Sequence, residues 1–364
     1  MMKNHYAIIM AGGVGARFWP YGTFKLPKQF LPIADSSDTM LQQTIKRLKD
    51  TVPLDRMYII TNKQYAGEVK KQIPKIPTGN IIGEPVGRNT APCIGLASII
   101  LRQFDEQAKM LVVPADHVIE NVDEFTKVVH TGLQFVEQNN AIVTLGIVPT
   151  HPETGYGYIQ FIEDAYFNVP GSSVDIFKVK TFAEKPTLDV AKVFLESGDF
   201  LWNSGMFIFR ADVMLLQMQK FLPDLYHALQ KIEKVIHSHN YQKVLQQVFA
   251  EIKGISVDYG IMEKAKNVYV IKAKFSWSDL GSWDEVYRLK RKDKNLNVIM
   301  GDTFVKDSKN NLIMSPKGFV GVIGAEDLII INTKEGLLIC KKGRSQEVKE
   351  IVDYLKRKGM IENI

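Results

Sequence analysis

Glycines and one arginine follow an apolar run near the start of the chain, in an arrangement that suits phosphate binding. Residues 6–10 are apolar and lead into the segment 11–17, Ala-Gly-Gly-Val-Gly-Ala-Arg. Glycines let a backbone approach a polyphosphate closely and turn amide groups toward it, and Arg17 adds a planar cation. The spacing matches neither the Walker A loop nor the dinucleotide-binding fingerprint. The segment alone predicts either a phosphate-binding loop or a glycine-rich turn without a ligand.

Two further segments carry single charged groups on short stretches of chain. Lys28 lies in the sequence Pro-Lys-Gln-Phe-Leu-Pro at 27–32, where the prolines stiffen the backbone that would hold its charge near phosphates. Asp116 and His117 follow the apolar run 109–113, and open α/β sheets bind ligands outside the carboxyl ends of their strands. Asp116 is a hard oxygen donor that suits Mg²⁺. For His117 we expect a hydrogen-bonding role, because no second His or Cys lies nearby at ligand spacing.

The segment 83–92, Gly-Glu-Pro-Val-Gly-Arg-Asn-Thr-Ala-Pro, enters a predicted helix. Glu84 and Asn89 offer an acceptor and an amide to the edge of a base, and Arg88 with the start of the helix offers anion binding. The alternative is plain helix capping by Asn89 or Thr90.

Several later segments mix glycine and aromatic residues with a few amides and carboxylates. They lie at 154–158, 183–186, 201–207, 256–263 and 277–283. Aromatic faces flanked by polar groups suit a sugar, although each segment alone is equally typical of a strand end or a turn.

The elements that must position these groups alternate in the first part of the chain. Apolar runs predict strands at 6–10, 57–61, 109–113 and 141–145, and helical spacing predicts helices at 40–49, 92–104 and 124–139. This alternation favours a mostly parallel sheet covered on both faces. From 155 to 274 the pattern is mixed. It predicts strands at 158–161, 179–183, 206–209 and 268–272, and helices at 188–195, 211–221, 225–237 and 241–249.

After residue 294 short apolar runs recur at close, regular spacing and predict a small β-rich domain. The runs are 303–305, 312–314, 319–323, 328–331 and 337–340. A final helix is expected between Ser345, a candidate cap, and Gly359.

Composition excludes several classes of protein. The 364 residues are 45% hydrophobic, enough for a large core. Two distant cysteines, Cys93 and Cys340, argue against a disulfide framework and favour a cytoplasmic location, and no run is long enough for a signal peptide or a membrane span. The net charge is +6, and its densest basic stretch, 288–294, lacks interleaved aromatic residues, so we interpret it as a solvated helix end rather than a nucleic-acid site.

Together and in this order, the segments resemble the sugar-nucleotide pyrophosphorylases. The resemblance rests on 11–20, 27–32, 84–92, 114–117, 184–186, 202–207 and 277–283, and it covers about residues 5–290 and the β-rich tail. It implies an α/β fold with a Rossmann-like nucleotidyltransferase domain at 1–290, whose sheet is mixed and mostly parallel. It also implies a small C-terminal domain of left-handed β-helix type at 295–364, ending in a helix.

The resemblance further implies an Mg²⁺-dependent reaction in which GTP and mannose 1-phosphate give GDP-mannose and pyrophosphate. The implied triphosphate contacts are Gly12, Gly13, Gly15, Arg17 and Lys28. The implied nucleotide-binding set also contains Ala11, Glu84, Arg88, Asn89 and Thr90. The implied sugar-phosphate contacts are Gly155, Tyr156, Gly157, Glu184, Lys185 and Asn203. Asp116 and Asp279 would hold Mg²⁺, and the expected catalytic set is Arg17, Lys28, Asp116, Lys185 and Asp279.

The sequence departs from the family pattern at Gly22 and Thr23, where many members carry Ser-Arg. One phosphate contact is therefore in doubt, and Lys25 is a candidate to replace it in part. The long cupin extension of bifunctional members is absent, so we expect no isomerase activity. We expect no nucleic-acid or membrane partner, and a homodimer is one possible assembly.

Three alternatives stay open on the sequence. The acceptor sugar could be another hexose 1-phosphate or a heptose 1-phosphate. A non-catalytic nucleotide-sensing module could use the same fold, although the expected basic groups and carboxylates are all present. An NAD-dependent oxidoreductase is disfavoured by the glycine spacing and because Asp35, the acidic residue about 20 positions after the glycines, lies in a polar stretch rather than at a strand end.

Overall fold

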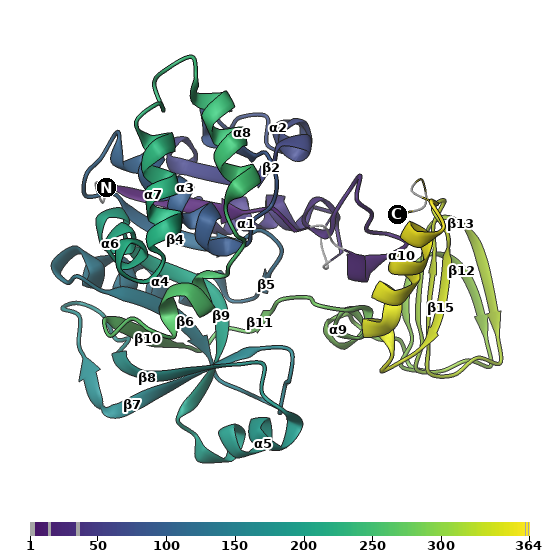
Figure 1. Cartoon of the computed structure of the whole chain (residues 1–364). Helices are drawn as coiled ribbons and strands as arrows, with labels where there is room; N and C mark the ends of the chain where they lie inside the picture. Colours follow the sequence, from purple (N-terminus) through teal and green to yellow (C-terminus); the bar gives the residue numbers. More distant parts are fainter. Residues whose placement is uncertain (1–3, 14–15, 34–36, 361, 363) are drawn as a thin grey trace. The chain divides into compact units, whose positions relative to one another are not determined.

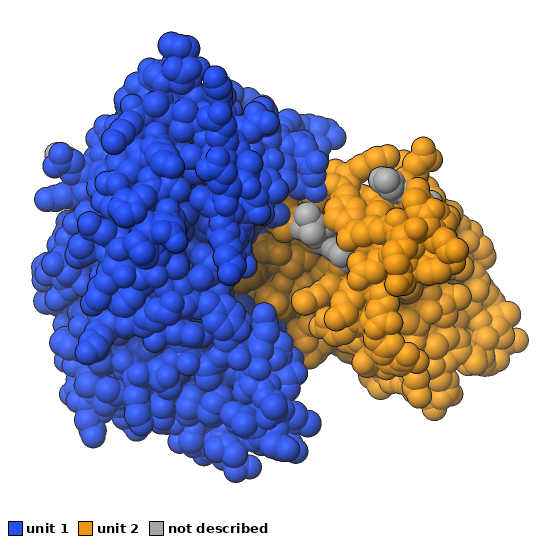
Figure 2. All heavy atoms as spheres, viewed as in Figure 1, with its two compact units in different colours: residues 1–12, 45–115, 119–277 blue, residues 13–44, 116–118, 278–364 orange. Residues whose placement is uncertain are grey.

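The computed structural model describes residues 4–13, 16–33, 37–360, 362 and 364. The chain divides into two units, coloured separately in Figure 2. Unit 1 comprises residues 1–12, 45–115 and 119–277, and unit 2 comprises 13–44, 116–118 and 278–364. Within the described ranges, no helix is both long and apolar enough to cross a membrane.

The strands and helices follow one another along the chain as labelled in Figure 1. The strands are β1 (His5–Met10), β2 (Met57–Asn62), β3 (Ile81–Glu84), β4 (Lys109–Pro114), β5 (Val118–Ile119), β6 (Ile142–Ile147), β7 (Gly157–Phe167), β8 (Ile176–Glu184), β9 (Phe200–Arg210), β10 (Val268–Ala273), β11 (Trp277–Ser278), β12 (Val298–Lys306), β13 (Leu312–Ile323), β14 (Leu328–Asn332) and β15 (Leu337–Lys341). The α-helices are α1 (Met40–Leu48), α2 (Ala66–Gln72), α3 (Thr90–Arg102), α4 (Val122–Gln138), α5 (Leu188–Ser197), α6 (Ala211–Phe221), α7 (Pro223–Glu233), α8 (Tyr241–Glu251), α9 (Trp283–Leu289) and α10 (Val348–Arg357).

Unit 1 is built on one large sheet with the strand order β3-β2-β1-β4-β9-β6-β10-β8-β7. The strands β3, β2, β1 and β4 run parallel, as the alternation of strands and helices predicts. The strand β9 then pairs antiparallel with both β4 and β6. The sheet is therefore mixed, with parallel strands from β3 to β4. This confirms the expected fold class.

Helices cover both faces of this sheet, as alternating side chains of β9 demonstrate. Phe207 and Phe209 belong to the core that also holds residues of α3, α6 and α7, such as Ile94 and Met218. Ile208 points the other way, because side chains alternate along a strand, and it lies against Gly132 of α4. The carboxyl ends of the strands are thereby left as the places where polar loops emerge.

Unit 2 combines the β-rich C-terminal part with an early stretch of the chain. Its sheet has the order β12-β13-β14-β15, with the first three strands parallel. Figure 1 shows α10 lying along these strands, and Val348, Val352 and Leu355 of that helix share a core with Trp283. Phe18 belongs to the same core, and the indole of Trp283 donates a hydrogen bond to the Trp19 carbonyl at 3.2 Å. The segment that contains Phe18 and Trp19 therefore packs against the C-terminal part of unit 2.

Most elements lie where the sequence predicts them, with some shifts. The helix predicted at 211–221 is α6 with those same bounds, whereas the helix predicted at 225–237 is α7 and ends at Glu233. The strands predicted at 312–314 and 319–323 are halves of one strand, β13, because both halves pair with β12 across a register shift. Two elements, β3 and α2, were not predicted from the sequence. The division into domains 1–290 and 295–364 stays a prediction.

Candidate active site

One pocket of unit 2 is lined by residues that come from separate stretches of the sequence. The pocket has a volume of about 320 Å³. Its lining contains five of the predicted site residues, Gly13, Arg17, Lys28, Asp116 and Asp279. Phe18, Gln29, His117, Leu280 and Gly281 complete it. The structure therefore brings together four of the five expected catalytic residues.

Short local structures place these side chains. Arg17 lies in a single 3₁₀ turn, Ala16–Phe18, and Lys28 opens another, Lys28–Phe30, directly after Pro27. Asp116 follows the end of β4, where the sequence predicted a ligand-binding group. Asp279 follows β11 and precedes α9, whose first turn is capped by the side chain of Ser282.

The ammonium group of Lys28 has three acceptors of the protein within reach. Its Nζ lies 2.8 Å from a carboxylate oxygen of Asp116. It also donates to the backbone carbonyls of Asp279 at 2.7 Å and Leu280 at 3.2 Å. The residue is only 7% exposed, so these bonds are made largely away from water. Burial alone would raise the pKa of Asp116, but the charge of Lys28, together with His117 and hydrogen bonds, outweighs it and lowers that pKa.

Both carboxylates of the pocket are donors of the kind that Mg²⁺ prefers. The Asp116 side chain is 31% exposed, and the carboxylate of Asp279 lies over Gly281, where a Cβ would come within 3.1 Å of it. Among the residues that the structure describes, no three His, Cys, Asp or Glu side chains are grouped so as to hold a metal. Two carboxylates in one pocket fit an ion that takes its other ligands from phosphates and water.

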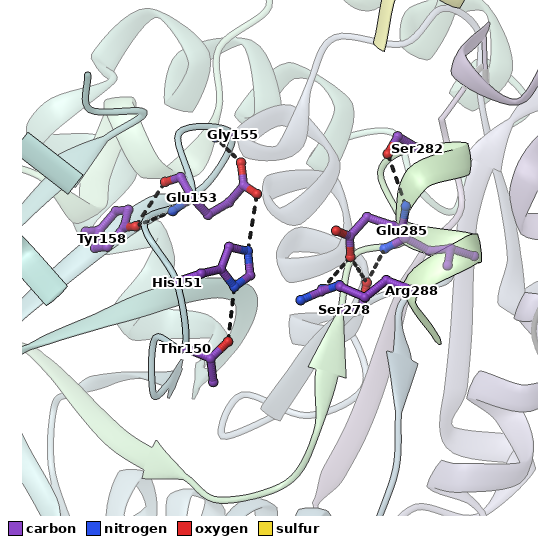
Figure 3. A network of polar contacts seen from close by, with 10 residues as sticks. Thr150, His151, Glu153, Gly155, Tyr158, Ser278, Ser282, Glu285 and Arg288 are labelled. Carbon is purple, nitrogen blue, oxygen red and sulfur yellow. Dashed lines mark hydrogen bonds and ion pairs between the residues drawn. The ribbon is translucent and has the colours of Figure 1, made fainter. Parts of the chain in front are cut away.

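The turn that carries Asp279 is held by a small polar network of unit 2. The hydroxyl of Ser278 accepts from the Leu280 amide at 3.0 Å and donates to the Glu285 carboxylate at 3.2 Å. Figure 3 shows Glu285 between Ser278 and Arg288, with its amide bonded to Ser282. Leu280 has a backbone φ of +47°, a strained conformation for a leucine. The network therefore fixes an unfavourable turn at the pocket.

A second group of predicted residues surrounds the end of β1 in unit 1. The amide of Ala11 donates to the Ile60 carbonyl at 2.7 Å. Glu84, at the end of β3, is 4% exposed, and its Oε1 has no hydrogen-bond partner among the described residues. Its other oxygen lies 3.8 Å from the point where Gly12 would carry a Cβ. Burial raises the pKa of Glu84 to about 8.

The residues that follow Glu84 bond within unit 1. The side chain of Asn89 caps α3 by accepting from the Thr90 amide at 2.8 Å, and the Thr90 hydroxyl accepts from the Val257 amide at 2.8 Å. The guanidinium of Arg88 donates to the carbonyls of Phe249 and Ala250 near the end of α8, each at 2.7 Å. Helix capping, the alternative for Asn89, is thus present, and Arg88 is engaged with the end of a different helix.

A third group, also in unit 1, contains the residues predicted for the sugar phosphate. Tyr156 makes edge contacts with two indoles, those of Trp202 and Trp277. Gly157 leaves room for Glu184, since a Cβ there would lie 2.4 Å from the Glu184 carboxylate. Lys185 is exposed and lies 3.4 Å from that same carboxylate. The group therefore combines an aromatic wall, a carboxylate and a cation.

A polar network of unit 1 adjoins this third group, since the ring of His151 makes an edge contact with that of Trp202. Figure 3 shows the Glu153 carboxylate between His151 and the amide of Gly155, with the hydroxyl of Tyr158 on the Glu153 backbone. Gly155 is thus a backbone donor whose amide is already bonded within the protein.

Sequence reasoning missed two residues of these groups, Asp258 and Gln29. The predicted Asn203 donates through its amide to Asp258 at 2.7 Å, and burial, reinforced by the charge of Glu184, raises the pKa of Asp258. Gln29 lines the first pocket and donates to the Gly13 carbonyl at 2.9 Å. Both residues lie inside segments that the sequence singled out, but nothing in those segments ranked them above their neighbours.

The structure tests only part of what the sequence predicts for the glycine-rich loop and for the segment that follows it. Gly15 lies outside the described residues. Gly22 and Thr23 form a turn in which the Gly22 amide bonds to the Phe18 carbonyl and the Thr23 amide to the Leu26 carbonyl. Lys25 is exposed, and its part in phosphate binding stays a prediction.

Comparison with known proteins identifies the family. The profile described as nucleotidyl transferase matches residues 6–295. The chain belongs to the nucleotidyl transferase family. A second profile, described as the mannose phosphate isomerase/GMP-like β-helix domain, matches residues 301–355 and agrees with the β-helix type expected for the tail. The nucleotidyl transferase resemblance inferred from the sequence is thus confirmed.

Individual relatives place the chain more narrowly. A mannose-1-phosphate guanylyltransferase of Salmonella muenchen is 40% identical over 362 residues, which cover 98% of this chain and 74% of the relative. One of Klebsiella pneumoniae is 38% identical over 96% of this chain and 74% of the relative. A crystal structure from Thermus thermophilus, described as a mannose-1-phosphate geranyltransferase, is 29% identical with a TM-score of 0.84, covering 97% of this chain and 99% of that one.

Proposed function

We propose that this chain transfers the GMP group of GTP to the phosphate of mannose 1-phosphate and releases pyrophosphate. The observation that carries the proposal is the 40% identity over almost the whole chain to a mannose-1-phosphate guanylyltransferase. The pocket of unit 2 supports it, because Arg17, Asp116 and Asp279 are the groups that a transfer between phosphates needs.

The reaction proposed is an in-line displacement. A phosphate oxygen of mannose 1-phosphate attacks the α-phosphorus of GTP and forms the new P–O bond. The bond from that phosphorus to the bridging oxygen breaks, and its electron pair leaves with pyrophosphate. A phosphate monoester is largely ionised at pH 7, so no side chain is needed as a base. Catalysis then rests on positioning and on neutralising charge.

The charged residues of the pocket divide this work. Asp116 and Asp279 would hold Mg²⁺, which when bound supplies positive charge to the phosphates. Arg17 is exposed at the pocket and suits the oxygens of the leaving pyrophosphate, since a guanidinium binds two phosphate oxygens at once. The sequence assigned the same role to Lys28, whose ammonium is engaged with acceptors of the protein.

The two groups of unit 1 supply the substrate contacts in this proposal. Guanine presents N–H donors on its pairing edge, and the buried, unpartnered oxygen of Glu84 is an acceptor that matches them. The aromatic wall of Tyr156 and the carboxylate of Glu184 suit a sugar ring, and the exposed cation of Lys185 suits its phosphate.

Three finer expectations are part of the proposal. Mg²⁺ is the metal, because carboxylate oxygens are ligands that suit it. The site of action is the cytoplasm, in keeping with two free cysteines. A homodimer stays a prediction.

A pyrophosphate-release assay tests the proposal. Four nucleoside triphosphates are crossed with mannose 1-phosphate, glucose 1-phosphate and a heptose 1-phosphate in the presence of Mg²⁺. We expect the highest kcat/KM with GTP and mannose 1-phosphate. Best activity with UTP or dTTP would overturn the guanine assignment, and tight GTP binding without any product would favour a sensing module instead.

A further inference from the structure

The carboxyl group of Asp258 adjoins the third group, in unit 1, but the proposed reaction gives it no task. Its Oδ1 accepts a hydrogen bond from the side-chain amide of Asn203 at 2.7 Å. Burial, reinforced by the charge of Glu184, raises the pKa of Asp258, so this is an unfavourable place for a second carboxylate. Among the described residues, Asn203 is the one side chain that donates to it.

The side chain of Asn203 is fixed at both of its polar ends. Asn203 lies in β9 beside a shift in the register between β9 and β6, and such bulges re-aim side chains. Its Oδ1 accepts from the amide of Gly205 at 3.1 Å. Gly205 has a backbone φ of +66°, which favours glycine. With Asp258 on the nitrogen and Gly205 on the oxygen, the side-chain amide has one orientation.

Gly157 connects this amide with the residues predicted for the sugar phosphate. A Cβ on Gly157 would lie 3.4 Å from the Cβ of Asn203 and 2.4 Å from the Glu184 carboxylate. A side-chain amide has two N–H donors, and Asp258 accepts from one of them. The second N–H is available to a hydroxyl or phosphate oxygen of a ligand, in the direction that the bond to Asp258 sets.

The backbone that carries Asp258 is itself held in place. Asp258 opens a π-helical turn, Asp258–Met262, a rare conformation that is frequent at functional sites. The preceding residue, Val257, is fully buried, and its amide donates to the hydroxyl of Thr90 at 2.8 Å. The carboxyl group is therefore presented to Asn203 from a fixed segment of unit 1.

We propose that Asp258 is a positioning residue, which orients the side-chain amide of Asn203 so that its second N–H is presented to the sugar 1-phosphate. This role rests on the proposed function, because Asn203 matters there as a substrate contact. The bond between the two side chains is a property of the protein without substrates, and it is tested without them below.

Kinetics of single variants test the positioning role. We expect Asp258→Ala to raise KM for mannose 1-phosphate by about tenfold, the effect of one hydrogen bond to a charged group, with KM for GTP unchanged. Asp258→Asn keeps an oxygen that accepts from Asn203 and should stay within about twofold of the wild type. Asp199→Ala is the matched control, because its carboxylate accepts from the Gln160 amide at 2.6 Å without a predicted substrate contact. An equal rise in KM for GTP, or no rescue by Asp258→Asn, would overturn the proposal.

A double-mutant cycle separates positioning from direct contact with the sugar. Positioning predicts that Asn203→Ala raises KM for mannose 1-phosphate as much as Asp258→Ala does, and that the double variant stays within about twofold of either. A carboxylate that binds the sugar itself predicts effects that multiply, to about a hundredfold in the double variant. That result, or an unchanged KM in Asn203→Ala, would contradict the proposal.

Exchanging the two residues separates presentation of the N–H from stability alone. Asn203→Asp sets two carboxylates against each other and should lower the Tm, and the added change Asp258→Asn restores a donor and an acceptor in reversed order. We expect the exchange to recover most of the Tm, measured without substrates, but to leave KM for mannose 1-phosphate raised, because position 203 then has no N–H. Recovery of both would reduce Asp258 to a structural role.

The Tm series also distinguishes failure of this role from failure of the proposed function. Without turnover of mannose 1-phosphate by the wild type, the proposed function fails and the positioning role fails with it, even where the exchange restores the Tm. An exchange that restores no Tm, with normal turnover in the wild type, removes the bond and leaves the proposed function standing.

Discussion

Glu84 illustrates how one buried residue links stability, pH and substrate choice. It is 4% exposed, and burial raises the pKa of its carboxyl to about 8, so the folded protein holds it neutral at pH 7. In the unfolded chain the carboxyl ionises near 4.5, its ordinary value. The stability that the neutral form contributes is therefore present below pH 4.5 and is lost as the pH rises toward 8.

Replacing Glu84 by Gln should remove this dependence. We expect the free energy of unfolding of the wild type to fall between pH 5 and pH 8 by more than that of Glu84→Gln, as measured by urea denaturation at several pH values. The same variant should flatten a rise of kcat/KM for GTP between pH 7 and pH 9, because the carboxylate form accepts from guanine. Parallel pH profiles in the two proteins would show that Glu84 is not the buried acid described above.

Gly157 makes a second prediction at the scale of one residue. A Cβ on Gly157 would come 2.4 Å from the Glu184 carboxylate, so Gly157→Ala must push that side chain aside. We expect KM for mannose 1-phosphate to rise by about tenfold or more, the effect of losing one hydrogen bond to a charged group, with KM for GTP unchanged. Gly79→Ala is the control, because nothing lies within 4 Å of its Cβ. A KM for GTP that rises equally would place Gly157 elsewhere in the reaction.

Elements differ in how well the sequence predicts them. The apolar run at 109–113 and the helical spacing at 124–139 predicted β4 and α4, because burial on a sheet and on a helix leaves distinct periodicities. The interval between the runs 312–314 and 319–323 suggested a break in what is one long strand, β13, since a bend that keeps the same partner strand looks like a turn in sequence. The contacts of Lys28 were not predictable, because residues 251 positions apart meet only through the fold.

Packing around β6 makes a prediction at the scale of elements. Gly146 of β6 lies between the strands β9 and β10, and a Cβ there would meet Leu201 and Val270 at 2.7 Å. Gly146→Ala should lower the free energy of unfolding by about 1–3 kcal/mol through overpacking. Gly67→Ala in α2 is the matched control, with open space around its Cβ, and should be neutral or stabilise by about 0.4–1 kcal/mol. Equal effects of the two changes in urea denaturation would contradict the packing described for the sheet.

At the scale of the whole molecule, the sequence predicted the family and the fold class because several weak motifs occurred in one order. No single motif was decisive, and the glycine-rich loop was equally compatible with a plain turn. The resemblance assigned chemistry to Lys28, Asp116 and Asp279, and the pocket of unit 2 contains all three. The resemblance did not predict that the Lys28 ammonium bonds to the Asp116 carboxylate and to the Asp279 carbonyl.

Formation of GDP-mannose from GTP and mannose 1-phosphate, followed by chromatography, is the most direct test of the central claim. The wild type is compared with Asp279→Asn, which keeps the backbone carbonyl that Lys28 uses and removes only the carboxylate charge. We predict GDP-mannose and pyrophosphate in equal amounts from the wild type with Mg²⁺, and a kcat lowered on the order of 10²–10³ in the variant. Absence of GDP-mannose with the wild type, or wild-type turnover in Asp279→Asn, would contradict the account.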